Sequence, residues 1–325
     1  MRAVVTGCAG FIGSHVCERL VADGWTVRGV DAFTAYYDPA EKEANLDGLI
    51  DEAGFSLVRG DLATMPLRPL LGDADVVVHL AAQPGVRASF GAGFARCDRD
   101  NVFATQRLLE AALATRCRRV VMASSSSVYG DAPVYPCPET APLSPRSPYA
   151  VSKRAGEDLG DVYRHLGLDV VALRYFTVYG PRQRPDMAVR RLCEALTGGP
   201  AFELYGAGHH VRDFTHVDDA VDATVRAASA VAPPPVLNVG GGEQASMGDV
   251  IDLLGDLAGR PVPVRAGATQ RGDVLRTGAD TTLARGLGWS PQVGLAAGLA
   301  TELDWVRARA GRTAPRDTVT AGRAS

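Results

Sequence analysis

The sequence predicts an α/β protein: a doubly wound, mostly parallel sheet, with a smaller lobe formed by the C-terminal part of the chain. Three observations predict this class. Short apolar, β-branched runs alternate with helical patterns through the first half of the sequence. The first of these runs breaks into a glycine-rich turn followed by a helix. With 325 residues, 46% of them hydrophobic, the chain can bury a large core and form two lobes.

Composition argues against several classes of protein. The formal net charge is −3, from 34 Lys and Arg against 37 Asp and Glu, without long runs of one sign, so no nucleic-acid partner is predicted. No apolar run reaches the roughly 18 residues that a membrane span needs, so no membrane partner is expected either. The six cysteines are scattered without a C-x-x-C pair, which favours reduced thiols and a cytoplasmic location. His209, His210 and His216 are interpreted as ordinary polar residues, and no metal site is predicted.

The N-terminal segment has the pattern strand, glycine turn, helix. The strand covers Arg2 to Thr6, and the helical pattern after the turn ends at Ala22. Gly7 permits the tight turn, Gly10 lets the backbone approach a pyrophosphate at the helix N-terminus, and Gly13 allows close packing of helix on strand. A bare glycine pattern would indicate only a loop, but this context is typical of a Rossmann-like dinucleotide-binding unit.

A second strand, Thr26 to Val30, ends in Asp31. A carboxylate at this position bonds the adenosine ribose hydroxyls of a bound dinucleotide and repels a 2′-phosphate. NAD is therefore favoured over NADP. The alternative interpretation of Asp31 is a turn acid at the end of a strand.

Further strands extend the predicted sheet, and several end in residues suited to a ligand. Small residues after His79 leave room for a flat cofactor ring, and the hydroxyls of Ser124 to Ser127 follow a buried strand where open parallel sheets bind ligands. A helix is predicted over Asp98 to Thr115. The further strands are Phe55–Val58, Asp75–His79, Arg119–Ala123, Asp169–Arg174 and Val236–Gly240.

Tyr149 and Lys153 stand four residues apart in Ser147-Pro148-Tyr149-Ala-Val-Ser-Lys153. On a helix they point to one face, one turn from each other. A nearby cation favours the phenolate, so Lys153 is expected to lower the pKa of Tyr149 and make it a usable base. Taken alone, a Tyr-x-x-x-Lys pair is more often a plain surface pair on a helix than a catalytic pair, so the rest of the chain must decide between the two interpretations.

Together, Thr6 to Gly13, His79 to Ala82, Ser124 to Gly130 and Tyr149-x-x-x-Lys153 resemble the extended short-chain dehydrogenase/reductase superfamily, in particular its NAD-dependent sugar-nucleotide epimerases. The resemblance implies tightly bound NAD that is not consumed, oxidation of a nucleotide sugar at C4, and Ser125, Tyr149 and Lys153 as the catalytic group. It also implies a homodimer through the helices Asp98 to Thr115 and Tyr149 to Leu166. The cofactor-binding residues that it implies are Gly7, Gly10, Phe11, Ile12, Gly13, Asp31, Asp61, Leu62, Leu80, Ala81, Ala82, Tyr149 and Lys153.

The serine stretch discriminates among subfamilies. At the positions of Ser125, Ser126 and Ser127, sugar-nucleotide 4,6-dehydratases have a sequence similar to Thr-Asp-Glu. UDP-glucuronate decarboxylases usually carry a glutamate at the position of Ser127. Those acids drive elimination or assist decarboxylation. Because this chain lacks them, return of the hydride and hence epimerisation is expected.

The segment after Arg174 predicts a binding loop. Four segments of the chain are similar to UDP-glucuronate 4-epimerases: Phe-Thr177-Val-Tyr-Gly, Arg184-Pro-Asp-Met-Ala, Tyr36-Tyr-Asp-Pro and Gln-Pro-Gly-Val-Arg87. A planar guanidinium suits a sugar carboxylate, a role assigned to Arg184 with Thr177 nearby. Pro84 and the pair Arg182-Gln183 depart from the epimerase patterns Ala-Gly-Val-Arg and Gly-Pro-Trp-Gly-Arg, and similar loops occur in bacterial nucleotide-sugar tailoring enzymes.

The remainder resembles the substrate lobe of the same enzymes. The resemblance places Arg212 on the nucleotide diphosphate, Arg271 on phosphate and Asp273 on the uridine ribose. We expect an NAD-binding domain over 1–175, with a return to it around 211–240, a sugar-nucleotide lobe over 176–310 and a disordered tail over 311–325. The substrate-binding residues are predicted to be Arg87, Ser125, Ser126, Ser127, Thr177, Arg184, Arg212, Arg271 and Asp273.

These features predict NAD-dependent 4-epimerisation of UDP-glucuronate to UDP-galacturonate through a 4-keto intermediate, with Tyr149 as the base. One alternative is a 4-epimerase of another UDP- or TDP-linked hexose, and another is a UDP-glucuronate decarboxylase. A non-catalytic NAD-binding scaffold is a third, opposed by the presence of Ser125, Tyr149 and Lys153 together. The exact sugar and nucleotide base stay open at this point.

Overall fold

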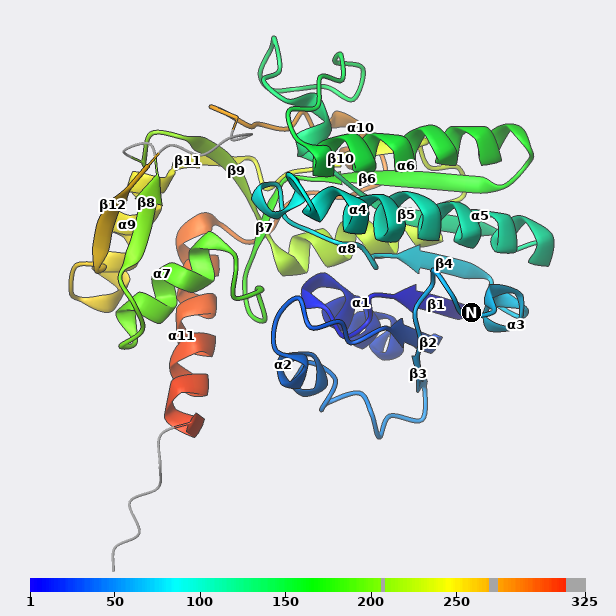
Figure 1. The fold of residues 1–325 in the computed structure, drawn as a ribbon, viewed down its shortest axis with the longest axis horizontal. Coiled ribbons are helices and arrows are strands. Elements are labelled where there is room, and N and C mark those ends of the chain that lie inside the picture. Colours follow the sequence, from blue (N-terminus) through cyan, green and yellow to red (C-terminus); the bar gives the residue numbers. More distant parts are fainter. Residues whose placement is uncertain (206–207, 269–273, 314–325) are drawn as a thin grey trace, which may run out of the picture.

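The computed structural model describes residues 1–205, 208–268 and 274–313. A seven-stranded sheet with the order β10-β6-β5-β4-β1-β2-β3 organises the N-terminal part of the chain, and all its neighbouring strands run parallel (Figure 1). The strand order reverses between β1 and β4, which is the doubly wound Rossmann arrangement, so the predicted fold class is confirmed. The strands are β1 (Arg2–Thr6), β2 (Thr26–Asp31), β3 (Phe55–Arg59), β4 (Val76–His79), β5 (Arg119–Ser125), β6 (Asp169–Tyr175) and β10 (Val236–Val239).

Both faces of this sheet are buried. Successive side chains of a strand point to opposite faces, so Val4 and Val5 of β1 belong to two different cores. The core around Val5 includes side chains of α1 and α8, whereas the core around Val4 includes side chains of α3, α5 and α6. The two layers are visible on opposite sides of the sheet (Figure 1). The helices are α1 (Phe11–Ala22), α3 (Leu67–Leu71), α5 (Ala104–Thr115), α6 (Pro148–His165) and α8 (Val217–Ser229).

The helix predicted to begin at Asp98 begins earlier. A short helix α4 (Gly93–Cys97) leads into a π-helical segment, Asp98–Phe103, which continues directly into α5. The wide turn carries the buried Asn101, whose side chain accepts a hydrogen bond from the amide of Gln83 at 2.7 Å and donates to its carbonyl at 3.0 Å. The predicted range, Asp98 to Thr115, therefore covers the π-helical segment and α5 but misses α4, which precedes them.

The C-terminal lobe holds two small sheets and its own core. β7 (Thr177–Tyr179), β9 (Val211–His216) and β11 (Glu243–Ser246) form one sheet, and β8 (Phe202–Tyr205) pairs with β12 (Val264–Gly267). Leucines of the lobe's helices pack together, including Leu192, Leu254 and Leu299. The helices of the C-terminal part, apart from α8, are α7 (Ala188–Leu196), α9 (Met247–Ala258), α10 (Thr282–Arg285) and α11 (Leu295–Thr313).

The last helix extends beyond its predicted end. α11 runs through Thr313, so residues 311–313, predicted to be disordered, are helical. The rest of the predicted tail, residues 314–325, lies outside the described residues.

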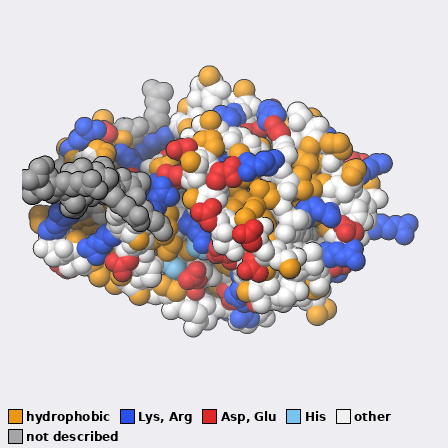
Figure 2. Space-filling view, turned by 90° about the horizontal axis from the view of Figure 1, so that it is seen from below, with side chains coloured by type: hydrophobic (Ala, Val, Ile, Leu, Met, Phe, Trp, Pro, Cys, Tyr) orange, Lys and Arg blue, Asp and Glu red, His pale blue; other side chains and the backbone are white. Residues whose placement is uncertain are grey.

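The surface carries both signs of charge. Lys and Arg side chains are interspersed with Asp and Glu over the face drawn in Figure 2. No helix among the described residues is long and apolar enough to cross a membrane. Within the same residues, no three His, Cys, Asp or Glu side chains come together in a way that could hold a metal ion.

Candidate active site

A cavity of about 510 Å³ lies at the carboxyl ends of β1, β4, β5 and β6. This is where open parallel sheets bind ligands. A second cavity, of about 500 Å³, adjoins it on the side of the C-terminal lobe. The two cavities share Tyr36, Gly85, Val86, Thr177, Arg184 and Arg212.

The predicted site residues converge on these cavities. Arg87 lines the second cavity, and Arg271 and Asp273 lie outside the described residues. The others line the first cavity: Gly7, Gly10, Phe11, Ile12, Gly13, Asp31, Asp61, Leu62, Leu80, Ala81, Ala82, Ser125, Ser126, Ser127, Tyr149, Lys153, Thr177, Arg184 and Arg212.

The glycine turn leaves the N-terminus of α1 open to the cavity. Gly7 has φ +70°, and a Cβ there would lie 2.8 Å from the amide nitrogen of Ala81. A Cβ on Gly13 would lie 2.0 Å from the carbonyl oxygen of Gly7, so the helix could not approach the strand. Gly10 is the N-cap of α1 and has no side chain that could bond to the first amides of the helix, so these amides remain available to a ligand in the cavity. These residues fit a dinucleotide pyrophosphate.

Asp31 has a partner that the sequence analysis missed. The Nζ atom of Lys42 lies 3.1 Å from Oδ1 of Asp31, and both side chains are buried. Asp61, predicted beside the cofactor, pairs with Arg99 at 2.5 Å, and Arg99 also lines the cavity. Neither partner lies at a spacing that would have marked it in the sequence.

Tyr149 and Lys153 lie one turn apart near the start of α6. Ser147 fixes this start, because its hydroxyl accepts a hydrogen bond from the amide of Ala150 at 3.1 Å and Pro148 occupies the first helical position. The Nζ atom of Lys153 lies 5.9 Å from the centroid of the Tyr149 ring. The predicted pair is therefore directed into the cavity from one helix face.

Ser125 lies beside the phenol at the end of β5. Its hydroxyl hydrogen-bonds to Tyr149. The same oxygen accepts hydrogen bonds from the amide of Ser127 at 3.2 Å and from the Ser127 hydroxyl at 2.9 Å. Ser127 thus holds the Ser125 hydroxyl in place by donating a hydrogen bond to it. An ionised glutamate at position 127 has no side-chain donor and could not make this bond.

The cation expected to tune Tyr149 is not the one that does so in the structure. Burial raises the pKa of Tyr149, and the groups that oppose this rise are Arg184 and the hydrogen bond from Ser125. Lys153 instead donates to the carbonyl of Ala123 at 2.9 Å. The prediction that Lys153 lowers the pKa of Tyr149 is corrected accordingly: in the protein alone, Arg184 supplies this effect.

The pKa of Lys153 itself is also shifted. Burial lowers its pKa from 10.5 to about 8, against the opposing effects of Cys97 and Glu157. The ammonium is therefore protonated below about pH 8 and loses its charge as pH rises through that value.

This titration can be observed directly, because the sequence contains only two lysines, Lys42 and Lys153. In nucleotide-free protein labelled with ¹³C,¹⁵N-lysine, we expect the Lys153 signal to titrate with a midpoint near pH 8. The variant Lys42→Arg assigns the signal by removing the other one. A midpoint at the ordinary value of 10.5 would contradict the burial argument.

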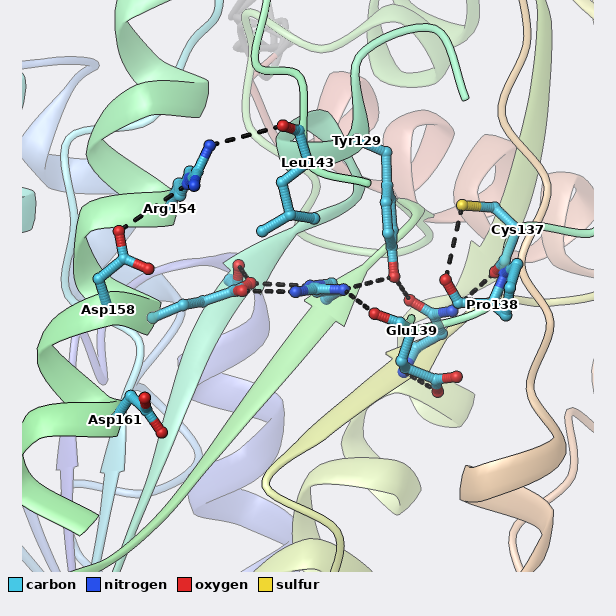
Figure 3. A network of polar contacts seen from close by, with 12 residues as sticks. Tyr129, Cys137, Pro138, Glu139, Leu143, Arg154, Asp158 and Asp161 are labelled. Carbon is cyan, nitrogen blue, oxygen red and sulfur yellow. Dashed lines mark hydrogen bonds and ion pairs between the residues drawn. The ribbon is translucent and has the colours of Figure 1, made fainter. Parts of the chain in front are cut away.

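A buried polar network supports the serine turn from behind. Glu157, one turn after Lys153 on α6, accepts a hydrogen bond from Ser124 and forms two hydrogen bonds to Arg174 at 2.9 and 2.6 Å. Arg174 donates to the Tyr129 hydroxyl at 2.8 Å, which donates to Asn238 at 2.7 Å. Figure 3 shows Tyr129 at the centre of this network, between the α6 helix and the Cys137 to Glu139 segment. The network fixes the end of β5, and hence Ser125, relative to α6.

Arg184 enters the cavity already paired with Asp186. Its Nε and Nη2 atoms donate to the two carboxylate oxygens at 2.9 and 3.0 Å. The hydroxyl of Tyr36 donates to the same carboxylate at 3.3 Å. In the part of the chain that the structure describes, Nη1 of Arg184 has no hydrogen-bond acceptor, so this edge of the guanidinium is open to a ligand.

The loop that carries Arg184 is tied to the helix behind the glycine turn. Arg182 has φ +67°, and its guanidinium donates to Ser14 at 3.2 Å and to Glu18 at 2.6 Å on α1. Gln183 is buried and bridges the carbonyl of Val178 and the amide of Arg190. Two of the three residues that depart from the epimerase patterns, Arg182 and Gln183, therefore hold the loop in place, between α1 and the lobe (Figure 1).

Cations also gather around the second cavity. The Arg87 guanidinium lies 4.3 Å from the centroid of the Tyr205 ring, and Arg191 and Arg212 line the same cavity. The Arg191 guanidinium lies 5.3 Å from the centroid of the Phe202 ring. Guanidinium groups together with aromatic rings suit a ligand with both an anionic part and a planar base.

The sequence matches the NAD dependent epimerase/dehydratase family over residues 3–240. The chain belongs to this family. This membership confirms the predicted resemblance, the assignment as an NAD-dependent sugar-nucleotide 4-epimerase, and NAD as the cofactor.

Solved structures of the family extend over nearly the whole chain. The UDP-glucuronic acid 4-epimerase of Bacillus cereus in complex with UDP-glucuronic acid and NAD has a TM-score of 0.90 at 39% identity, covering 95% of this chain and 100% of that one. MoeE5 in complex with UDP-glucuronic acid and NAD has a TM-score of 0.86 at 41% identity, with coverage of 95% and 100%. The UDP-glucose 4-epimerase of Mycolicibacterium smegmatis is 38% identical over 320 residues, 94% of this chain and 99% of that protein.

Proposed function

We propose that this epimerase converts UDP-glucuronate to UDP-galacturonate by 4-epimerisation through a 4-keto intermediate. The observation that carries the proposal is the position of Arg184. Its guanidinium lines both cavities, and its charge acts on the phenol of Tyr149. A sugar held beside Tyr149 by its 4-hydroxyl would thus have a cation within reach of its carboxylate.

We assign the cofactor to the N-terminal domain, residues 1–175 with the return at 211–240, and the nucleotide sugar mainly to residues 176–310. Asp31 would hold the adenosine ribose, Lys153 the nicotinamide ribose, and the glycine turn the pyrophosphate. When bound, NAD supplies reversible hydride transfer at C4 of the sugar and, in its oxidised form, a positive charge.

The chain's own residues move the proton. Tyr149 removes it from the 4-hydroxyl, while Ser125 hydrogen-bonds to the same oxygen. The 4-keto sugar then turns over in the cavity, so that the hydride returns to the opposite face of C4 and Tyr149 gives the proton back to the 4-oxygen. No net redox change occurs, so the protein should retain its cofactor through turnover.

Ser127 supports epimerisation over decarboxylation. A 4-keto uronate is a β-keto acid, and loses CO2 when the bond from C5 to the carboxylate aligns with the carbonyl π system. Ser127 donates to Ser125 and adds no acid or base of its own. A carboxylate held by Arg184 away from that alignment would survive until the hydride returns.

The principal test is incubation of the purified enzyme with UDP-glucuronate and, separately, UDP-glucose, with the products separated by chromatography and identified by NMR. UDP-galacturonate from the first substrate alone is the expected result. UDP-xylose would show decarboxylation. No turnover of either substrate would direct the same assay to TDP-linked hexoses, and no turnover of these either would favour the non-catalytic scaffold.

A second candidate is a 4-epimerase of the UDP-glucose type. The observation that favours it is the ion pair of Arg184 with Asp186, which already occupies two donors of the guanidinium. UDP-galactose formed from UDP-glucose, with UDP-glucuronate unused, would establish this alternative.

The tie between the loop and α1 makes a prediction for substrate affinity. Arg182→Leu removes the contacts to Ser14 and Glu18, so we expect Arg184 to shift and KM for UDP-glucuronate to rise about tenfold, since small misplacements of a binding group are costly. Arg19→Leu is the matched control, because it removes another long-range ion pair of α1, to Asp222, away from the loop. Equal KM values in both variants would show that the tie has no role in substrate binding.

The predicted homodimer is part of the proposal. Large apolar side chains are exposed on α4, the π-helical segment and α6, namely Phe94, Phe103, Val151 and Val162. The π-helical segment and α6 belong to the two helices that the resemblance places in the interface, and α4 directly precedes the first of them. Light scattering of the purified protein measures the outcome.

A further inference from the structure

We infer that Lys42 determines cofactor binding together with Asp31: the two side chains form one site for the hydroxyl pair of the adenosine ribose of NAD. The first support is the placement of lysine in the chain. Lys and Arg total 34, yet only Lys42 and Lys153 are lysines, and both line the same cavity. Lysine is ordinarily a surface residue, so this distribution indicates a role that arginine does not fill.

The second support is an ammonium with unused donors. Lys42 lies in the last turn of α2 (Pro39–Ala44), and its side chain is 10% exposed. Among the described residues, Oδ1 of Asp31 is the single hydrogen-bond acceptor of Nζ, at 3.1 Å. An ammonium has three N–H donors, and leaving them unpaired away from water is costly. Because Lys42 lines the cavity, a ligand oxygen can accept from it.

The third support is the arrangement of hydrogen bonds on Asp31. Oδ1 accepts from Lys42 and, at 2.7 Å, from the amide of Phe33. Oδ2 accepts only one long bond among the described residues, from the amide of Ala9 at 3.3 Å. Oδ2 therefore retains capacity for a hydroxyl donor, while Nζ retains capacity for a hydroxyl acceptor. A vicinal diol offers both at once.

The same geometry explains why arginine would not serve. A guanidinium at this position would bind both oxygens of Asp31 through its planar fork, and Oδ2 would no longer be open to the ribose. Lys42→Arg keeps the charge and the ion pair, yet should weaken NAD binding. Lys42→Arg thus distinguishes hydrogen bonding to the ribose, which it should impair, from a purely electrostatic role of Lys42, which it would preserve.

The experiment measures binding to nucleotide-free protein by calorimetry, without turnover. The ligands are NAD and its analogues lacking the 2′- or the 3′-hydroxyl of the adenosine ribose. The variants are Lys42→Arg and, as a neutral donor, Lys42→Gln. Arg59→Lys is the matched control: Arg59 pairs with Glu43 near Phe33, is 57% exposed in its side chain, and lies outside the cavity.

We expect wild type and Arg59→Lys to bind NAD about tenfold more tightly than at least one deoxy analogue, since the hydrogen bond that the analogue lacks is made to a charged group. Both Lys42 variants should bind NAD about tenfold more weakly and lose that discrimination. NAD affinity unchanged in Lys42→Arg and Lys42→Gln would overturn the inference. So would an undiminished preference for NAD over the deoxy analogues in those variants, because the lost affinity would then reflect structure alone.

Discussion

Tyr149→Phe is expected to lower kcat for the nucleotide sugar by about 100- to 10,000-fold, the range that a positioned general base contributes. The phenylalanine ring fills the same space but cannot accept the 4-hydroxyl proton. Nucleotide binding should persist, because the glycine turn and the arginines of the second cavity are untouched. Single-turnover kinetics and calorimetry with UDP measure the two properties separately.

Tyr163→Phe is the matched control for this change. Tyr163 lies on the same helix, α6, and its hydroxyl bonds to Glu110 at 2.8 Å and Gln106 at 2.9 Å, outside the cavity. Its loss should leave kcat near that of the wild type. Near-normal turnover by Tyr149→Phe would remove the tyrosine from the mechanism.

Arg184→Ala should reduce kcat/KM for UDP-glucuronate by about 100-fold or more, because charge-assisted hydrogen bonds to a carboxylate are among the strongest. Affinity for UDP, which has no sugar carboxylate, should change little. The residual turnover should release CO2: the C5–C6 bond of the 4-keto uronate breaks, its electron pair forms the enolate of the 4-ketone, and C5 then takes up a proton. Trapped ¹⁴CO2 from labelled substrate and chromatography of the sugar products measure this partition.

Two further variants separate the charge of Arg184 from its pairing. Arg184→Lys keeps a cation but loses the planar fork, so intermediate activity is expected. Asp186→Asn frees the guanidinium from its ion pair and should not abolish uronate turnover. If Arg184→Ala retained both its uronate activity and a clean product, the uronate assignment would be wrong and the UDP-glucose type would be preferred.

Much of the fold follows from local patterns. β1, the turn at Gly7 and α1 were predicted with their bounds, because a short apolar run, a glycine that must adopt positive φ and a helical period are all visible within a few residues. The N-cap of α9 at Ser246, with Asp249 three residues on, is equally local. By contrast, the π-helical segment at Asp98–Phe103 carries contacts from the Gln83 loop and gave no such signal.

The sequence by itself determined the class of the protein and most of the side chains that line its cavities, since the chemistry is carried by short motifs at the ends of strands and at one helix start. Only the tertiary structure decided how those side chains are paired. Lys42 beside Asp31, Asp186 and Tyr36 around Arg184, and Arg182 against α1 all join separate segments. The physical reason is that burial and pairing depend on which strands and loops come into contact in the folded chain. The spacing of residues along the sequence carries no information about contacts between such distant segments.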